Sequence, residues 1–129
     1  TLTFEYGLCP FAGAMEPASL LRHVDAMQTR VRSHGVDELP EPTSLLTLRA
    51  GKAVVVALKP ADNGDGGVIR FWNPSAAPVE DEISFAKPVQ GAWTCNLNEE
   101  PIHPVALREA GRIPVMVPAY GLASVRFRW

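Results

Sequence analysis

Two groups of carboxylates are the first residues of this 129-residue chain to consider for acid–base chemistry. They are Glu80-Asp81-Glu82 and Glu99-Glu100. On a strand, Glu80 and Glu82 share one face, where two like charges repel each other and do not divide into a general acid and a general base. Because no spacing selects a second, separated carboxylate, we expect no catalytic residue in this chain.

The histidines and cysteines do not have the spacing of a metal site. His23, His34 and His103 are dispersed, and neither Cys9 nor Cys95 has a partner at the Cys-x-x-Cys spacing of zinc ligands. We therefore expect no metal and no cofactor in this domain. The two cysteines could form one disulfide, but a chain of this length can fold without it, so two reduced and mostly buried thiols are the main expectation.

A glycine-rich loop runs from Asp62 to Gly67 with the sequence Asp-Asn-Gly-Asp-Gly-Gly. It does not end in the Gly-Lys-Ser/Thr of a phosphate-binding loop. Counted from Asp62, the twelfth position of an EF-hand loop falls on Asn73, where glutamate is required. Glycine, asparagine and aspartate tolerate the positive φ of tight turns, so the loop is predicted to join two strands as a hairpin.

The tryptophans are candidates of another kind, because exposed coplanar rings could stack on sugar rings. Strand alternation favours Trp93 and Trp129 as side chains that fill the interior. Trp72 is less clear, since its neighbours on the same strand face are both polar and apolar. We therefore single out Trp72, Arg70 and Asn73 as candidate sugar-facing residues.

The elements that must position these residues follow from composition and periodicity. The chain is 47% hydrophobic and 20% charged, with a formal net charge of −2, which is ordinary for a soluble globular domain. It has no block of like charges and no apolar run of about eighteen residues. The composition therefore excludes a basic nucleic-acid-binding arm and a membrane span.

One helix and a series of short strands are predicted. Pro17 suits a first helical position, and apolar residues at helical spacing follow it, which predicts a helix over 17–28 that covers the sandwich. Residues 1–10 alternate between apolar and polar and are predicted as a leading strand. Residues 33–43 indicate a linker. Residues 44–129 form the main sandwich, with strands predicted at 45–49, 53–58, 68–73, 79–85, 92–97, 113–117 and 122–129.

These elements predict a mainly β fold, an antiparallel β-sandwich of about eight strands with one short covering helix near the N-terminus. Residues 1–129 are expected to form a single domain. The run 53–58 is β-branched and continuous, so this strand is expected to be buried on both faces. The chain begins with Thr1 and is expected to be a fragment of a larger enzyme.

Several segments have an order that is specific enough to compare with a known family. Residues 54–62 form an apolar strand that ends in lysine, and 64–75 form an acidic glycine-rich turn and a strand that ends in Arg-x-x-Asn-Pro. In these segments, and in 89–101 and 117–127, the chain resembles the C-terminal β domain of glycoside hydrolase family 38, the α-mannosidase family. Upstream, Phe4-Glu5-Tyr6-Gly7-Leu8 is similar to the family's preceding strand, although Phe11 stands where the family often has histidine.

The resemblance implies a non-catalytic C-terminal β-sandwich domain that supports an α-mannosidase-like glycoside hydrolase and walls one side of its sugar cleft. The family's retaining mechanism uses an Asp nucleophile, a separate acid/base carboxylate and a zinc-type divalent ion. The resemblance places all three in a catalytic barrel outside this chain. The implied partners are the catalytic and helical domains of the same parent chain and, indirectly, the carbohydrate, with no nucleic acid and no membrane.

Two other interpretations stay open. A stand-alone carbohydrate-binding module would need at least two coplanar Trp or Tyr rings on one exposed face. An unrelated immunoglobulin-like interaction domain would have a different strand order.

Overall fold

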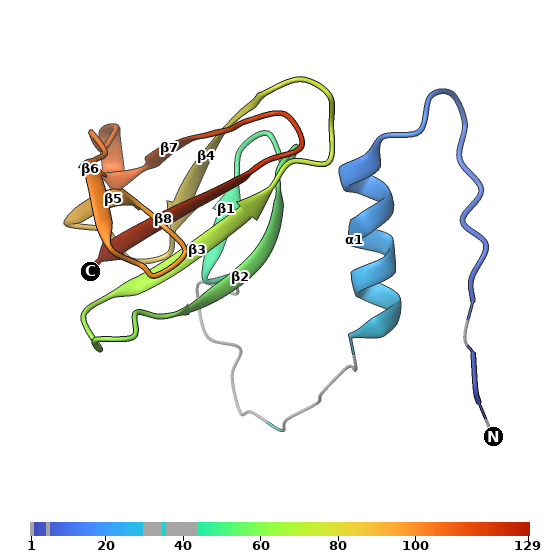
Figure 1. Cartoon of the computed structure of the whole chain (residues 1–129), viewed down its shortest axis with the longest axis horizontal. Helices are drawn as coiled ribbons and strands as arrows, with labels where there is room; N and C mark the ends of the chain where they lie inside the picture. The colour runs from blue at the N-terminus through green and yellow to red at the C-terminus, as the bar shows by residue number, and fades with distance from the viewer. Residues whose placement is uncertain (1, 5, 30–34, 36–43) are drawn as a thin grey trace.

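The computed structural model describes residues 2–4, 6–29, 35 and 44–129. Within them, eight strands form two antiparallel sheets, and one α-helix precedes the first strand (Figure 1). The predicted mainly β sandwich is therefore confirmed. The predicted linker 33–43 lies outside the described residues, except for Gly35.

The larger sheet has five strands in the order β2-β3-β8-β5-β6, and the smaller sheet has three in the order β1-β4-β7. The strands of the larger sheet are β2 (Val54–Pro60), β3 (Gly67–Trp72), β5 (Gly91–Cys95), β6 (Pro101–Pro104) and β8 (Leu122–Arg128). Those of the smaller sheet are β1 (Leu46–Leu48), β4 (Val79–Phe85) and β7 (Ile113–Val117), and a short 3-10 helix, η1 (Glu109–Gly111), precedes β7.

The core lies between the two sheets, because apolar side chains alternate along the strands with polar or exposed ones. On the central strands of the larger sheet, Ile69, Phe71, Val125 and Phe127 are at most 2% exposed. The smaller sheet buries Ile83, Ile113, Val115 and Val117 in the same cluster.

Aromatic rings join the two sheets at one end. The ring centroids of Phe85 on β4 and Phe127 on β8 lie 4.4 Å apart. Trp129 packs edge-on against both rings at 5.1 Å. Trp129 thus packs against the core from the rim, but it is 41% exposed and does not fill the interior as predicted.

The prediction that Trp93 fills the interior is wrong. Trp93 pairs with Arg126 of β8 on the outer face of the larger sheet, and the Arg128 guanidinium lies over its ring at 5.6 Å. Ala92 takes the interior position instead and is 2% exposed. A five-residue strand can place either set of alternate residues inward, and the pairing with β8 selected the set that the sequence did not favour.

The predicted strand over 1–10 is not formed in its described residues, 2–4 and 6–10. An alternating segment becomes a strand only where a neighbouring edge supplies hydrogen-bond partners, and in this structure no edge pairs with these residues. The eighth strand is instead β6, in a proline-punctuated stretch for which the sequence predicts no strand. β6 is an edge strand, where proline is tolerated because one side of the strand has no ladder to donate to.

The expectation that the strand over 53–58 is buried on both faces is also wrong. β2 lies at the edge of the larger sheet, and Val56 and Leu58 are 49% and 39% exposed. A register shift between Val55 and Ala57 interrupts its pairing with β3. A continuous apolar run therefore marked a strand here, but it did not mark a central one.

The helix α1 (Pro17–Gln28) spans the predicted residues. The Glu16 carboxylate caps it by accepting a 2.7 Å hydrogen bond from the backbone N–H of Ser19. Ala18 is fully buried and Arg22 donates to the carbonyl of Gly51, so α1 touches the sandwich near β2. The rest of the helix stands beside the sandwich rather than over it (Figure 1). Among the described residues, no helix has the length and apolar character needed to cross a bilayer.

Candidate functional site

The three residues predicted to face a sugar lie at the end of β3, but the structure does not bring them to one surface. Arg70 and Trp72 are two residues apart and share the outer face of the larger sheet, opposite Ser124 and Leu122 of β8. Asn73 follows the strand and begins the turn toward β4.

Asn73 is 0% exposed and is fully used within the protein. Its Nδ2 donates to the carbonyl oxygens of Ala77, Val117 and Pro118 at 2.8, 3.3 and 3.0 Å. Its Oδ1 accepts from the backbone N–H and the hydroxyl of Ser75 at 2.9 and 2.6 Å. Asn73 therefore ties the β3–β4 turn to the end of β7 and has no surface to offer a sugar.

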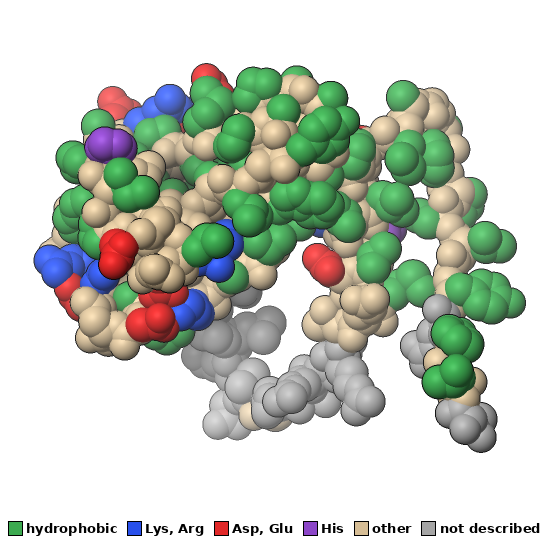
Figure 2. Space-filling view, viewed as in Figure 1, with side chains coloured by type: hydrophobic (Ala, Val, Ile, Leu, Met, Phe, Trp, Pro, Cys, Tyr) green, Lys and Arg blue, Asp and Glu red, His purple; other side chains and the backbone are tan. Residues whose placement is uncertain are grey.

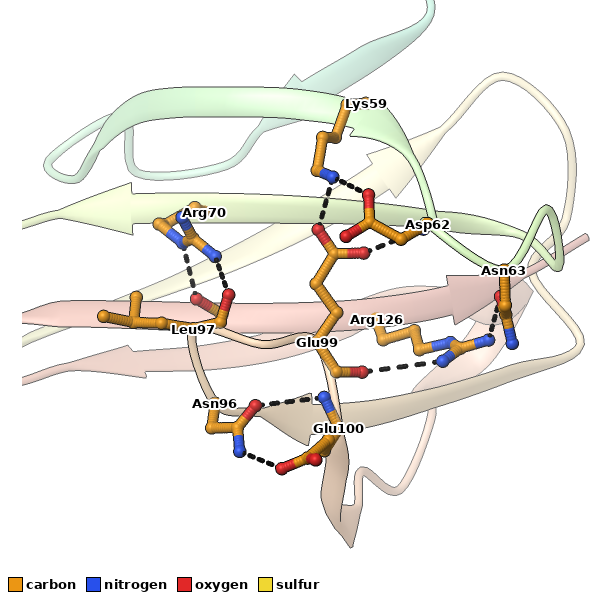
Figure 3. Close-up of polar contacts among 10 residues, drawn as sticks. Lys59, Asp62, Asn63, Arg70, Asn96, Leu97, Glu99, Glu100 and Arg126 are labelled. Atoms are coloured by element: carbon orange, nitrogen blue, oxygen red, sulfur yellow. Dashed lines mark hydrogen bonds and ion pairs between the residues drawn. The ribbon is translucent and has the colours of Figure 1, made fainter.

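Arg70 holds a loop against the outer face of the larger sheet. Its Nε donates to Ser124 Oγ at 2.9 Å, and its Nη2 donates to the carbonyl oxygen of Leu97 at 3.3 Å. Figure 3 shows the guanidinium turned toward the loop that follows β5. The Leu97 side chain on this loop is 64% exposed. Arg70 is thus half-buried, and its guanidinium is hydrogen-bonded to residues of its own domain.

Trp72 is the member of the three that keeps an accessible apolar surface. It is half-buried, and its cross-strand neighbour Leu122 is 51% exposed on the same outer face. The two side chains form a small apolar area at the end of β3, beside the turn that Asn73 anchors.

A buried carboxylate whose partners the sequence did not reveal lies on the same face. Glu99, in the loop between β5 and β6, is 5% exposed and has a φ of 65°. The Nζ of Lys59 lies 2.6 Å from Glu99 Oε1 and also contacts the Asp62 carboxylate (Figure 3). The backbone N–H of Asp62 donates to Glu99 Oε2 at 3.0 Å. Glu99 therefore joins the glycine-rich hairpin to the β5–β6 loop.

The electrostatics of this cluster favour the ionised forms. The hydrogen bond from Lys59, followed by that from the Asp62 N–H, holds the pKa of Glu99 below its ordinary value. Hydrogen bonds to Asp62 and Glu99 raise the pKa of Lys59. A general acid that works near neutral pH needs a carboxyl whose pKa is raised. Glu99 has the opposite shift and is suited to anchoring loops.

A second buried carboxylate lies on the outer face of the smaller sheet. Glu82, on β4, is 3% exposed and accepts hydrogen bonds from Nη1 of Arg108 and Nη1 of Arg112, both at 2.8 Å. The hydrogen bond from Arg108 is the main cause that lowers the pKa of Glu82. Glu80 shares this face as predicted and is exposed. The repulsion between the two glutamates is therefore offset by arginines 26 and 30 residues away from Glu82.

A groove of about 510 Å³ runs beside Glu82. Two arginines and three acidic residues line it together with apolar side chains: Arg49, Ala50, Glu80, Asp81, Glu82, Arg108, Pro114, Val115 and Met116. Asp81 accepts from the backbone N–H groups of Ala50 and Lys52, so both buried carboxylates of the groove already have partners. This lining contains no aromatic ring on which a sugar could stack.

The carboxylates do not fit a zinc-type ion. No three His, Cys, Asp or Glu residues within the described part of the chain are grouped to hold a metal. Lys59 occupies the space between Asp62 and Glu99, and two arginines bind Glu82, so protein cations already take these oxygen atoms. Of the histidines, His23 on α1 and His103 on β6 are exposed, and His34 lies outside the described residues.

The cysteines occupy different environments and both are free. Cys95 packs with Ala61 and Val68 beneath the β5–β6 loop, and burial raises the pKa of its thiol. Cys9 is exposed. The expectation of mostly buried thiols therefore holds for Cys95 and is wrong for Cys9, because the segment that carries Cys9 does not join the sandwich.

Comparison with known proteins adds one finding. A family model described as the glycosyl hydrolases family 38 C-terminal beta sandwich domain matches residues 52–122. The match spans more than half of the chain and runs from the residues before β2 to the start of β8. No curated protein and no solved structure matches the chain.

Proposed function

The chain belongs to glycoside hydrolase family 38, as its C-terminal β-sandwich domain, and on this premise we propose that it supports the catalytic part of an α-mannosidase-like enzyme. The family match is the observation that carries this proposal. The matched residues include the glycine-rich hairpin, Trp72 and the buried glutamates Glu82 and Glu99. The coarser statement, a non-catalytic domain of a glycoside hydrolase, follows from the family itself.

The chemistry of the described residues fits a structural role rather than a catalytic one. Glu82 and Glu99 are the buried glutamates, and lowered pKa values keep both ionised. In the proposed parent enzyme, the nucleophile, the acid/base carboxylate and the divalent ion would come from the catalytic domain. The β-sandwich domain would contribute a rigid surface.

We also propose that Trp72 forms part of the wall of the sugar cleft. Arg70 would support it by holding the loop that follows β5. Trp72 offers an apolar ring surface beside Leu122, the arrangement that packs against the face of a sugar ring. Asn73 is withdrawn from this set because it has no exposed atom.

The test is Trp72→Ala in the complete parent enzyme, with the hydrolysis of an aryl α-mannoside as the assay. One aromatic contact is worth about 0.5–1.5 kcal/mol. We therefore expect KM to rise about two- to tenfold with little change in kcat. Trp93→Ala is the matched control, because this tryptophan is on the same sheet face and its ring is already covered by Arg128.

Two results would count against the proposal at different levels. A parent enzyme that hydrolyses another glycoside and not α-mannosides would overturn the mannosidase assignment. An active parent whose KM is the same with Trp72→Ala would overturn the cleft-wall role and leave the assignment intact. Thermal unfolding of both variants checks that neither change acts through stability.

No observation favours the stand-alone carbohydrate-binding module over this proposal. Among the described residues, the ring–ring contacts join Phe85, Phe127 and Trp129 between the two sheets, and none joins the outer-face rings of Trp72 and Trp93. Titration of this chain with mannosides, followed by tryptophan fluorescence, distinguishes the two: a saturable change would favour the module.

A further inference from the structure

The loop of residues 96–100, between β5 and β6, lies against the outer face of the larger sheet, and we call it the strap. Its one large apolar side chain, Leu97, is 64% exposed, so burial of apolar surface contributes little to holding it. Within the strap, Asn96 Nδ2 donates to Glu100 Oε2 at 2.6 Å, and the Glu100 N–H donates to Asn96 Oδ1 at 3.0 Å (Figure 3). These two bonds brace the strap internally, so it can move as one piece.

Charged groups hold the strap to the rest of the domain. In the described part of the chain, every hydrogen bond from the strap to another element has a charged donor or a charged acceptor. Figure 2 shows basic and acidic side chains interspersed over this end of the larger sheet, around the β2–β3 hairpin. The strap is therefore fastened by ion pairs and charge-assisted hydrogen bonds rather than by packing.

Glu99 is the main fastening. Its carboxylate lies 2.6 Å from the Nζ of Lys59 and accepts a 3.0 Å hydrogen bond from the backbone N–H of Asp62. The φ of Glu99 is 65°, in the left-handed region that L-residues avoid. The bonds of its side chain thus hold the strap in an unfavourable backbone conformation. If the charge of Glu99 is removed, the strap loses its shortest contacts to the sheet and its backbone gains by relaxing.

Two arginines of the larger sheet supply the remaining contacts. Arg70 on β3 donates to the Leu97 carbonyl at 3.3 Å, and Arg126 on β8 donates to the Glu99 carbonyl at 3.5 Å. Both distances are longer than the usual N–H···O range of about 2.7–3.2 Å. The shorter contact of Arg126, at 2.7 Å, goes to Asn63 Oδ1 in the hairpin. The arginines alone are therefore weak anchors for the strap.

A small apolar cluster lies under the strap, apart from the main core. It consists of Ala61, Val68 and Cys95, which are 4%, 1% and 8% exposed. Burial raises the pKa of the Cys95 thiol, and the charges of Arg70 and Glu99 also act on it. The groups that fasten the strap thus lie close to the thiol. Because a covered thiol reacts only when its cover opens, Cys95 reports on the strap.

We propose that the strap is a charge-latched cover, which opens as one piece when the contacts of Glu99 break while the two sheets stay folded. This opening controls the access of solvent and of thiol reagents to Cys95. It costs less free energy than global unfolding, because the apolar cluster between the two sheets stays intact. The proposal concerns this chain alone and does not depend on the activity of a parent enzyme.

The reaction of Cys95 in the folded chain tests this proposal. In a Cys9→Ser background Cys95 is the only thiol, and its alkylation by iodoacetamide is followed by mass spectrometry at constant pH and increasing urea. Opening of the strap alone exposes little surface, so the rate should barely depend on urea at low concentrations. It should rise steeply only where global unfolding takes over. A rate that follows global unfolding at every urea concentration would overturn the proposal.

Variants of the latch give the second readout. Glu99→Gln keeps the size of the side chain and removes its charge, and should speed the low-urea reaction of Cys95 by about tenfold or more. Lys59→Met should have the same effect from the other side of the ion pair. The matched control is Glu100→Gln, next in the chain, whose side chain bonds only within the strap. It should change the rate by less than about twofold.

Glu82→Gln controls for a general loss of stability, because it breaks a buried ion pair on the other sheet. It should lower the urea midpoint of global unfolding, measured by tryptophan fluorescence, and leave the low-urea reaction of Cys95 unchanged. If Glu99→Gln and Lys59→Met lower that midpoint in the same way without speeding the low-urea reaction, Glu99 stabilises the whole domain and the proposal is wrong.

Discussion

Glu82 and Glu99 show what buried carboxylates contribute to this domain at the scale of single residues. Each is held by cations from another part of the chain: Arg108 and Arg112 bind Glu82, and Lys59 binds Glu99. Removing a buried charge from water is costly unless the charge is paired, so these pairs specify which loops lie on which sheet face. The sequence predicted the face that Glu82 shares with Glu80 but not its partners, because nothing local links residues so far apart.

Stability should rise with pH across the acidic range. The pKa values of Glu82 and Glu99 are lowered by folding, so the unfolded chain binds more protons near its carboxyl pKa. Their contribution is complete above the ordinary glutamate pKa of about 4.3 and is lost as the pH falls through the lowered folded values. Glu82→Gln should therefore flatten the dependence of the unfolding free energy on pH between about pH 3 and 5.

Urea unfolding at a series of pH values measures this slope. Glu80→Gln is the matched control, because Glu80 lies on the same strand face, is exposed and forms no ion pair with another described residue. An equal loss of slope in both variants would show that the arginine pairs are not its source. At alkaline pH the sign reverses for Lys59: its raised pKa means that its contribution is present below the ordinary value of about 10.4 and is lost above the folded value.

At the scale of elements, the β2–β3 hairpin shows what a glycine-rich loop does in this fold. The Ala61 N–H donates to the Gly66 carbonyl at 3.1 Å, and the Gly64 N–H donates to the Ala61 carbonyl at 2.8 Å. Gly64 and Gly66 have φ values of 76° and 81°. The loop is thus the predicted hairpin. Its composition was a reliable signal because the backbone conformation itself requires glycine.

Gly66→Ala and Gly64→Ala separate two reasons for glycine in this hairpin. A left-handed conformation costs an L-residue about 1–2 kcal/mol, and we expect this loss for Gly64→Ala, because its Cβ meets nothing within 4 Å. A Cβ at Gly66 would overlap the carbonyl oxygen of Phe127. Gly66→Ala should therefore destabilise by clearly more, since β8 must shift as well. Thermal and urea unfolding measure both, and equal losses would contradict the role of close packing.

Strand order was less predictable than strand content. The periods of β3, β4, β7 and β8 were visible in the sequence because their alternation is regular. The edge positions of β2 and β6 were not, since β2 reads as a buried run and β6 as a proline-rich loop. Burial of a strand depends on which strands flank it, and this is a property of the sheet.

At the scale of the whole molecule, the described chain has a packed part and an uncovered part. Phe127 and Phe85 bridge the two sheets, and the sandwich encloses one large apolar cluster. The side chains of Leu2, Phe4, Tyr6 and Leu8 and most of α1 remain outside this cluster. The stability of this chain should therefore come from the sandwich.

Phe127→Ala and Phe4→Ala test this division. Loss of a fully buried phenylalanine typically costs about 3–5 kcal/mol, which we expect for Phe127→Ala. Phe4 is 81% exposed, so Phe4→Ala should change the unfolding free energy of this chain by less than about 0.5 kcal/mol. Urea unfolding followed by tryptophan fluorescence measures both. A comparable loss for Phe4→Ala would show that the segment packs on the sandwich in solution.

Local chemistry determined several features of this protein. The helix over 17–28 begins at a proline preceded by a capping glutamate, and the hairpin at 62–67 needs glycine. The turn residues around 60–75 and the pattern of the strand segments along the chain were enough to indicate the family that the domain model matches. These features depend on residues close together in the chain.

Only the tertiary structure decided which residues are available for function. It withdrew Asn73 into the core, turned Trp93 outward, paired Glu82 and Glu99 with distant cations and left Leu2, Phe4, Tyr6 and Leu8 uncovered. Each of these outcomes depends on contacts between segments far apart in the sequence. Alternation alone does not decide which of the two sets of alternate residues faces the core, nor whether another strand pairs with the segment. Packing between the elements decides both.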